Sequence, residues 1–256
     1  MSDATVGYEV ADGLARIVLN RPPVNALDLD MIARIVAALE DAGKDETVRA
    51  VLLTSAIAGR FCAGLDLGIL VGKSESKARS FLQELYVRLH DVQYNLGKPS
   101  IAVVSGAARG GGMTLAISCD VILAGARATF GYPEIDVGVL PAIHFAHLPR
   151  IVGRHRAFEL LFSARSFGAE EAYRLGLVSK VVPDADLAAE ATALGRTFAA
   201  KSPVVMRLAR AAFMRQNDLD YRRSIATAVE DFVNVTMTDA AQEGLRAFLQ
   251  HGLPRR

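Results

Sequence analysis

The first hydrophobic positions of the chain fall in two short β-rich runs, residues 5–10 and 14–19. Asp12 and Gly13 lie between these runs, and this dipeptide favours a tight hairpin turn. The pattern therefore predicts that the chain begins with a β-hairpin.

Apolar positions then change to helical spacing. Ile32, Ile35 and Leu39 recur at intervals of three and four residues, which predicts an amphipathic helix over residues 28–41. Further along, the pattern predicts buried strands over residues 48–54, 100–105 and 120–124, a long helix over residues 75–95 and a short helix over residues 113–118. Strands and helices alternate, which indicates an α/β fold.

The second half of the chain is helical almost throughout. The predicted helices cover residues 154–163, 185–200, 203–216, 221–236 and 240–250. The sequence has no linker or low-complexity boundary between the halves and no internal repeat, so we expect one α/β core with an appended helical region.

Composition excludes several classes of protein. The 256 residues include 29 basic and 28 acidic side chains, a net charge of +1 spread along the chain, which argues against nucleic acid as the main ligand. Hydrophobic residues make up 51% of the chain, yet no apolar run reaches the roughly 18 to 20 residues of a membrane span. The N-terminus shows no export signal and the two cysteines form no CxxC pair. We therefore expect a cytoplasmic protein with Cys62 and Cys119 as buried free thiols.

A glycine-rich segment, residues 106–112, lies between a predicted strand and a predicted helix. Glycines let the backbone approach a ligand closely, and the first N–H groups of a helix can stabilise negative charge. The lysine of a phosphate loop and the spacing of the dinucleotide fingerprint are both absent from this segment. It is therefore either a tight turn or part of an oxyanion hole.

A second turn of small residues, residues 60–67, follows the strand that ends near Thr54. Asp66 in this turn is either a helix cap or part of a binding loop. Two separate strand-to-helix turns, each with a backbone N–H, are what a carbonyl oxygen requires if it is to be polarised toward an enolate.

Glu134 lies in an otherwise apolar stretch, residues 130–136. If this carboxyl is desolvated, its pKa rises toward the range in which one group can both remove and return a proton. The alternative is a surface glutamate that follows a proline turn.

Two histidines, His144 and His147, are three residues apart and would share a face of a helix, which permits a metal pair. No HExxH pattern accompanies them and no third ligand is evident, so we favour a pocket-lining or helix-surface role and predict no metal. Arg150, Arg154 and Arg156 are expected to form a solvated face.

Several longer motifs are spread over most of the chain. They are residues 21–27 (RPPVNAL), residues 61–67 (FCAGLDL), the glycine run with Cys119 and Asp120 behind it, residues 130–134 (FGYPE), and residues 165–183. Together these motifs resemble the crotonase family, also called the enoyl-CoA hydratase/isomerase superfamily.

The resemblance implies an α/β fold of the crotonase (ClpP-like) type, a superhelix of β-β-α units with a C-terminal helical region. Residues 1–195 would be the core with the acyl-CoA site, and residues 196–256 would be a helical trimerisation region of the same structural unit. The implied assembly is a homotrimer or a dimer of trimers. The implied ligand is an acyl-CoA thioester, so coenzyme A is part of the substrate and no separate cofactor is expected.

The roles of single residues carry over position by position. The backbone N–H groups of Leu65 and Gly111 would form the oxyanion hole, and Glu134 would transfer the proton. The CoA and substrate path would be lined by Val24, Ala26, Ala63, Asp66, Leu67, Gly110 and Pro133.

The chain departs from the family's hydratases in its carboxylates. Those enzymes carry two glutamates, whereas here Thr114 stands at the first position and Glu134 is retained at the second. A lone glutamate resembles the family's double-bond isomerases, so isomerisation of an enoyl-CoA is the first expectation. Hydration, thioester hydrolysis or carbon–carbon cleavage with one carboxylate are alternatives, as is a noncatalytic acyl-CoA binding protein.

A second departure is residues 141–147, interpreted as a loop in which Ile143, His144 and Phe145 replace a small, glycine-rich stretch. Ile143 and Phe145 are expected either to pack in the core or to line the acyl pocket. His144 is the candidate second polar group beside Glu134, able to orient a substrate or share a proton.

Overall fold

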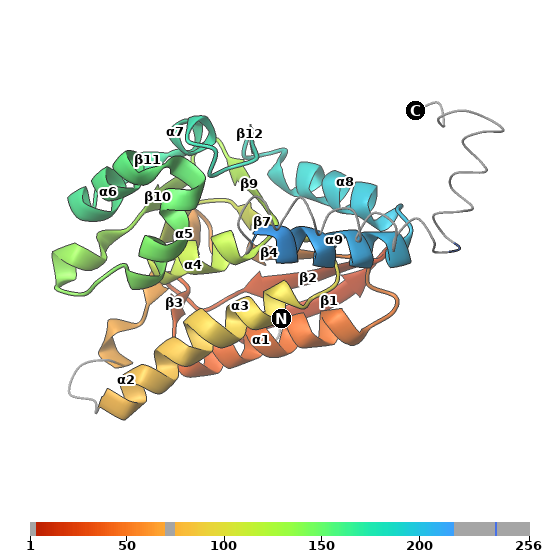
Figure 1. Ribbon diagram of the computed structural model, residues 1–256, viewed down its shortest axis with the longest axis horizontal. Helices are drawn as coiled ribbons and strands as arrows, with labels where there is room; N and C mark the ends of the chain where they lie inside the picture. The colour runs from red at the N-terminus through yellow and green to blue at the C-terminus, as the bar shows by residue number, and fades with distance from the viewer. Residues whose placement is uncertain (1–3, 70–74, 218–238, 240–256) are drawn as a thin grey trace.

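The structure is a computed structural model that describes residues 4–69, 75–217 and 239. Its centre is a six-stranded sheet (Figure 1). In spatial order, the strands are β1 (Val6–Ala11), β2 (Leu14–Leu19), β4 (Ala50–Ser55), β7 (Ser100–Val104), β9 (Val121–Gly125) and β12 (Lys180–Val182). β1 and β2 pair antiparallel, and every later pair in the sheet is parallel.

The predicted N-terminal hairpin is confirmed. Asp12 and Gly13 have φ values of 53° and 76°, the two successive positive values that a two-residue hairpin turn of this type requires. Alternate residues of β2 then face opposite sides of the sheet, so that Leu14 packs in one cluster and Ile17 and Leu19 in another.

Helices cover both faces of the large sheet (Figure 1). One face carries α1 (Leu29–Lys44) and a continuous helical segment made of α2 (Glu75–Leu82), a π-helical stretch (Gln83–Arg88) and α3 (Leu89–Tyr94). The other face carries α8 (Leu187–Ala199), whose Leu187 and Ala191 pack in the cluster that contains Leu52 and Val103. The sheet is therefore buried on both sides, as parallel sheets generally are.

A second, four-stranded sheet joins the segments that contain the candidate motifs. Its strands are β11 (Phe167–Gly168), β10 (Thr129–Gly131), β8 (Ala107–Arg109) and β5 (Arg60–Cys62), and a separate pair is formed by β3 (Ala26–Leu27) and β6 (Gly64–Leu65). Strands of two or three residues are too short to show an alternating pattern, so the sequence analysis did not find them.

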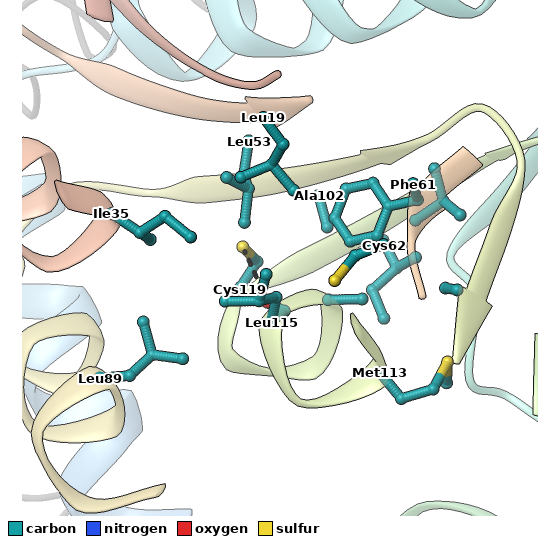
Figure 2. Close-up of a cluster of buried hydrophobic side chains, with 14 of the residues drawn as sticks. Leu19, Ile35, Leu53, Phe61, Cys62, Leu89, Ala102, Met113, Leu115 and Cys119 are labelled. Carbon is teal, nitrogen blue, oxygen red and sulfur yellow. Dashed lines mark hydrogen bonds between the residues drawn. The ribbon is translucent and has the colours of Figure 1, made fainter. Parts of the chain in front are cut away.

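Helix α4 (Gly111–Ser118) lies in the core, which explains its lack of a polar face. Figure 2 shows Met113 and Leu115 of α4 among side chains from the large sheet, α1 and α3, which include Leu19, Leu53, Ala102, Ile35 and Leu89. Cys62 and Cys119 are buried and free, as predicted, and burial raises the pKa of each thiol to about 12.

The interpretation of residues 141–147 as a loop is wrong, because they lie largely in helix α5 (Ala142–Val152). His144, Leu148 and Val152 recur every four residues and are all buried, which is the spacing of one helix face. Helices α6 (Arg154–Ser163), α7 (Ala169–Arg174) and α9 (Pro203–Asn217) follow.

The predicted boundary between residues 195 and 196 falls inside α8, so it does not separate two structural elements. The helices predicted over residues 221–236 and 240–250 lie outside the described residues, and the trimerisation role of residues 196–256 stays a prediction. Among the described residues, no helix is long and apolar enough to cross a membrane.

Candidate active site

The two turns that were predicted to offer backbone N–H groups lie side by side. A Cβ atom on Gly64 would be 2.8 Å from Arg109 O and 3.2 Å from Gly111 N, and one on Gly111 would be 3.1 Å from Leu65 Cδ2. Glycine at positions 64 and 111 permits this close approach of β6 to the start of α4. The structure thus brings Leu65 and Gly111 together.

The loop before β3 is held by Asn25, which is fully buried with a φ of 54°. Its side-chain N–H groups donate to Ser55 Oγ (2.8 Å) and to Phe61 O (2.9 Å), and its Oδ1 accepts from the N–H of Arg21 (2.7 Å). The Cys62 thiol donates to Asn25 O at 3.0 Å. These bonds tie the loop to β4 and β5 and seat β3 beside β6.

Five of the seven residues predicted along the CoA path lie at an accessible edge of this loop pair. Val24, Ala26 and Asp66 are partly exposed, and Ala63 and Leu67 are exposed. Asp66 also has a structural role, because its carboxylate lies 2.9 Å from the Arg21 guanidinium and accepts from the N–H of Gly68 at 3.3 Å. It directly precedes the short 3₁₀ helix η1 (Leu67–Ile69), as the helix-cap alternative expects.

Gly110 is buried and precedes α4 with φ 48° and ψ −113°, a conformation that L side chains rarely adopt. Its N–H donates to Gly131 O at 3.1 Å, and its carbonyl accepts from the N–H of Thr114 at 3.1 Å. The N–H of Gly111 belongs to the first turn of the helix and has no intrahelical acceptor. This N–H is therefore available to a ligand.

Glu134 lies in the 3₁₀ helix η3 (Pro133–Val137), which follows β10 and begins at the partly exposed Pro133. Its side chain is only 14% exposed, and desolvation raises the pKa of the carboxyl. A Cβ atom on Gly110 would be 2.9 Å from Glu134 Oε1, so the carboxyl reaches the start of α4. The surface-glutamate alternative is wrong, because Glu134 Oε2 is buried and has no hydrogen-bond partner within the described residues.

Thr114 lies in the first turn of α4 and is fully buried. Its Oγ1 has no hydrogen-bond partner among the described residues, although its N–H bonds to Gly110 O. Thr114 and Glu134 therefore both adjoin Gly110, and each has a buried oxygen that no described protein group satisfies.

His144 projects from α5 toward the same point. Its side chain is 1% exposed, and its Nε2 lies 3.2 Å from Gly110 O and 3.8 Å from Glu134 Oε1. Its Nδ1 lies 3.3 Å from His147 Nε2. Burial lowers the pKa of His144 to about 3 and that of His147 to about 4, so both rings are neutral near pH 7. Among the described residues, no group of three or more His, Cys, Asp or Glu side chains is placed to hold a metal ion.

Comparison with known proteins identifies the family. The family model for enoyl-CoA hydratase/isomerase matches residues 9–255 of the chain. The chain belongs to the enoyl-CoA hydratase/isomerase family. It is 34% identical over 254 residues to the crotonyl-CoA hydratase of Syntrophomonas wolfei, covering 98% of this chain and 96% of that protein. It is 33% identical to the human mitochondrial methylglutaconyl-CoA hydratase, covering 90% of this chain and 69% of that protein.

Solved structures agree with this assignment. The crystal structure of an enoyl-CoA hydratase from Mycobacterium smegmatis superimposes with a TM-score of 0.92 at 31% identity, covering 99% of each chain. An enoyl-CoA hydratase from Bacillus anthracis gives a TM-score of 0.90 at 29% identity, covering 98% of each chain. The fold is thus the crotonase fold of this family, as the motifs implied.

One expectation for the α5 region needs correction. Phe145 does not pack in the core, because it is 39% exposed and stacks on Phe162, 5.8 Å between ring centroids, and its role in lining the acyl pocket stays a prediction. The helical phase of α5 turns His144 inward and therefore turns its neighbour Phe145 outward. Arg150, Arg154 and Arg156 are exposed, as predicted.

One residue of the site was missed by the sequence analysis. Tyr132 precedes the Pro-Glu pair, is fully buried, and packs its ring edge-on against His144 at 4.6 Å between centroids. Its hydroxyl has no hydrogen-bond partner among the described residues. An aromatic residue just before Pro133 was the available signal, but it reads equally well as ordinary core.

Proposed function

We propose that this enzyme adds water to the double bond of a 2-enoyl-CoA, with the single carboxylate of Glu134 moving the proton. The observation that carries the proposal is the pair of buried oxygens beside Gly110, Glu134 Oε2 and Thr114 Oγ1, which have no partner among the described residues. Buried polar atoms in native proteins are almost always hydrogen-bonded. A water molecule can satisfy each of these atoms, because it can donate to the carboxylate and can bond to the hydroxyl.

The relatives support hydration over the isomerisation that the single glutamate first suggested. Proteins of 32–34% identity that align along more than nine-tenths of this chain carry the names crotonyl-CoA hydratase and short-chain-enoyl-CoA hydratase. Hydration therefore becomes the first proposal for this chain.

The proposed reaction balances with one carboxylate. The thioester oxygen accepts hydrogen bonds from the N–H groups of Leu65 and Gly111, which stabilise it as an enolate oxygen. As the water oxygen bonds to Cβ, Glu134 takes the proton of that water and the double-bond electrons move to the thioester oxygen. Glu134 then returns the proton to Cα, which gives a 3-hydroxyacyl-CoA and restores the carboxylate.

Isomerisation is the second candidate, because Thr114 supplies no second carboxyl to the site. In that reaction Glu134 would take a proton from Cα of a 3-enoyl-CoA and return it to Cγ, with no change in mass. Thr114 takes no part as a base, because a hydroxyl needs a neighbour to accept its proton.

The test is product analysis with purified protein on crotonyl-CoA and on a 3-enoyl-CoA. Hydration adds the mass of one water, isomerisation leaves the mass unchanged, and thioester hydrolysis releases free CoA. We expect the water adduct from crotonyl-CoA, and we expect Glu134→Gln to slow its formation about a hundredfold or more. Tight acyl-CoA binding without turnover of any thioester would instead identify a noncatalytic binding protein and contradict the proposal.

A further inference from the structure

The direction in which the Gly111 N–H points is set by the orientation of the Gly110 carbonyl, because both belong to the same peptide unit. Because a peptide unit is planar and trans, the C=O of Gly110 and the N–H of Gly111 point in opposite directions. Gly110 has φ 48° and ψ −113°, a conformation that L side chains rarely adopt, and hydrogen bonds to its peptide groups fix its orientation. A group that fixes Gly110 O thereby also fixes the Gly111 N–H.

Two donors reach Gly110 O from different helices. One is the N–H of Thr114 at 3.1 Å, an ordinary bond of α4. The other is Nε2 of His144 at 3.2 Å, which comes from α5. Hydrogen bonds in series polarise one another, so a donor on the carbonyl of a peptide makes its N–H a stronger donor.

His147 determines which nitrogen of His144 carries the proton. A carbonyl oxygen can only accept, so the bond to Gly110 O requires the Nε2–H tautomer of His144 and leaves its Nδ1 as an acceptor. His147 Nε2, at 3.3 Å, can donate to that Nδ1. His147 Nδ1 lies 3.1 Å from Ile143 O. Two neutral rings carry only two protons for these three contacts, so His147 can donate to His144 only in the tautomer that leaves its own Nδ1 without a proton for Ile143 O.

We propose that His144 is a positioning residue that aims and polarises the Gly111 N–H through Gly110 O, and that His147 holds His144 in the donating tautomer. The inference rests on the proposed function, because it gives the Gly111 N–H a thioester oxygen to bind. It differs from an acid–base role for His144. The 3.8 Å between its Nε2 and Glu134 Oε1 exceeds a hydrogen bond, and the Nε2–H already bonds to Gly110 O.

The experiment compares His144→Phe with His144→Gln. Phenylalanine keeps the ring that packs on Tyr132 but has no donor, whereas the glutamine amide can place an N–H where Nε2 was. Both changes are also made in the Glu134→Gln background, in which bound crotonyl-CoA labelled with ¹³C at its thioester carbonyl is not turned over. The infrared frequency of that carbonyl reports its polarisation.

We expect His144→Phe to lower kcat about tenfold with KM changed by less than about twofold, a fraction of the effect of deleting an oxyanion donor. In His144→Phe, the infrared frequency of the bound carbonyl should move back toward its value in water. His144→Gln should restore most of kcat and most of the carbonyl polarisation. His147→Leu, at a partly exposed position, should produce a smaller shift in the same direction.

Three results would overturn the inference. They are a carbonyl frequency that is unchanged in His144→Phe, a loss in His144→Gln as large as in His144→Phe, and an unchanged frequency in His147→Leu. His147→Leu also serves as the test if His144→Phe does not fold. A carbonyl that is not polarised even with His144 intact would count against the proposed oxyanion hole instead, so the two failures are distinguishable.

Discussion

Gly110 is the residue around which the proposed chemistry is arranged. Glu134 Oε1 lies 2.9 Å from where a Cβ on Gly110 would be, and Thr114 and His144 both bond to the Gly110 carbonyl. These contacts join α4, α5 and η3 at one backbone unit. The site therefore depends on a peptide orientation as much as on side chains.

Gly111→Ala should lower kcat/KM by tenfold or more, because losing one oxyanion donor costs on the order of 10²–10³ in kcat. The added Cβ would lie 3.1 Å from Leu65 Cδ2 and 3.2 Å from Leu27 Cδ1, and the shift that relieves these contacts would turn the N–H. Gly168→Ala is the matched control, since a Cβ there meets nothing within 4 Å. Equal kinetics for the two variants on crotonyl-CoA would contradict the role of Gly111.

Thr114 separates the two candidate reactions. Thr114→Val removes, at nearly constant volume, the hydroxyl that has no partner among the described residues. It should slow hydration, while isomerisation of a 3-enoyl-CoA should persist. Thr114→Glu should raise hydration of a short 2-enoyl-CoA, although a second buried carboxylate also costs stability. A well-folded Thr114→Glu with an unchanged hydration rate would show that other features of the pocket control the entry of water.

Residues with a chemical signature could be found from the sequence, whereas residues with a geometric role could not. Glu134 in an apolar stretch and the glycines before α4 were identifiable because their types are unusual in those contexts. Tyr132 was not, because a buried tyrosine is a common core residue and its partner His144 is contributed by a different helix. The hydrogen bond from His144 to Gly110 O joins positions 34 residues apart and leaves no local pattern.

At the scale of elements, α5 makes the fold sensitive to acid. Burial lowers the folded-state pKa of His144 to about 3 and of His147 to about 4, while both are near 6.5 when unfolded, so the unfolded chain binds more protons below pH 6.5. Each histidine should therefore remove about 1.4 kcal/mol of stability per pH unit as pH falls below 6.5. The partly buried His90, whose pKa is also lowered, adds to this effect, and Glu134 with its raised pKa opposes it.

Urea unfolding at pH 6.5 and at about pH 5 measures this slope, the change in the free energy of unfolding per pH unit. His147→Leu should flatten the slope relative to the unchanged protein, and His155→Leu, at an exposed position of α6, should leave it as it was. The same slope in all three proteins would show that the α5 histidines do not stay neutral in the folded state.

Elements with long, regular patterns were predicted and short ones were not. The helix predicted over residues 28–41 corresponds to α1, which begins one residue after its N-cap Asp28 and extends to Lys44. By contrast, β3 and β6 have two residues each, and their pairing depends on the buried side chain of Asn25. α5 was not predicted as a helix, because the resemblance to the family led us to expect a loop at residues 141–147. The four-residue spacing of His144, Leu148 and Val152 was the signal for a helix there.

At the scale of the whole molecule, Arg210 connects α9 to the α/β core through hydrogen bonds. Its buried guanidinium donates to Asp120 Oδ2 (2.9 Å), Tyr94 O (2.9 Å) and Gln93 O (2.6 Å), so it joins α9 to α3 and to the start of β9. Through this contact, α9 packs on the core as part of the same structural unit.

Arg210→Met should reduce the free energy of unfolding by about 3 to 5 kcal/mol, because it leaves Asp120 and two carbonyls without their shared donor. Arg210→Lys should recover little, since one ammonium cannot reproduce the geometry of the planar guanidinium. Arg156→Met on the exposed face of α6 is the control and should change stability by less than about 0.5 kcal/mol in denaturant titrations. An equally small change in the free energy of unfolding for Arg210→Met would contradict the role of Arg210 in holding α9 against the core.

The central claim is that one carboxylate, Glu134, moves the proton. The most direct test is the kcat of Glu134→Gln on crotonyl-CoA, measured together with the affinity of the variant for the same thioester. We predict that kcat falls about a hundredfold or more while affinity changes little, because Glu134 acts in proton transfer and not in holding CoA. Asp136→Asn, on the exposed part of η3, should keep normal turnover. Near-normal kcat in Glu134→Gln would contradict the account.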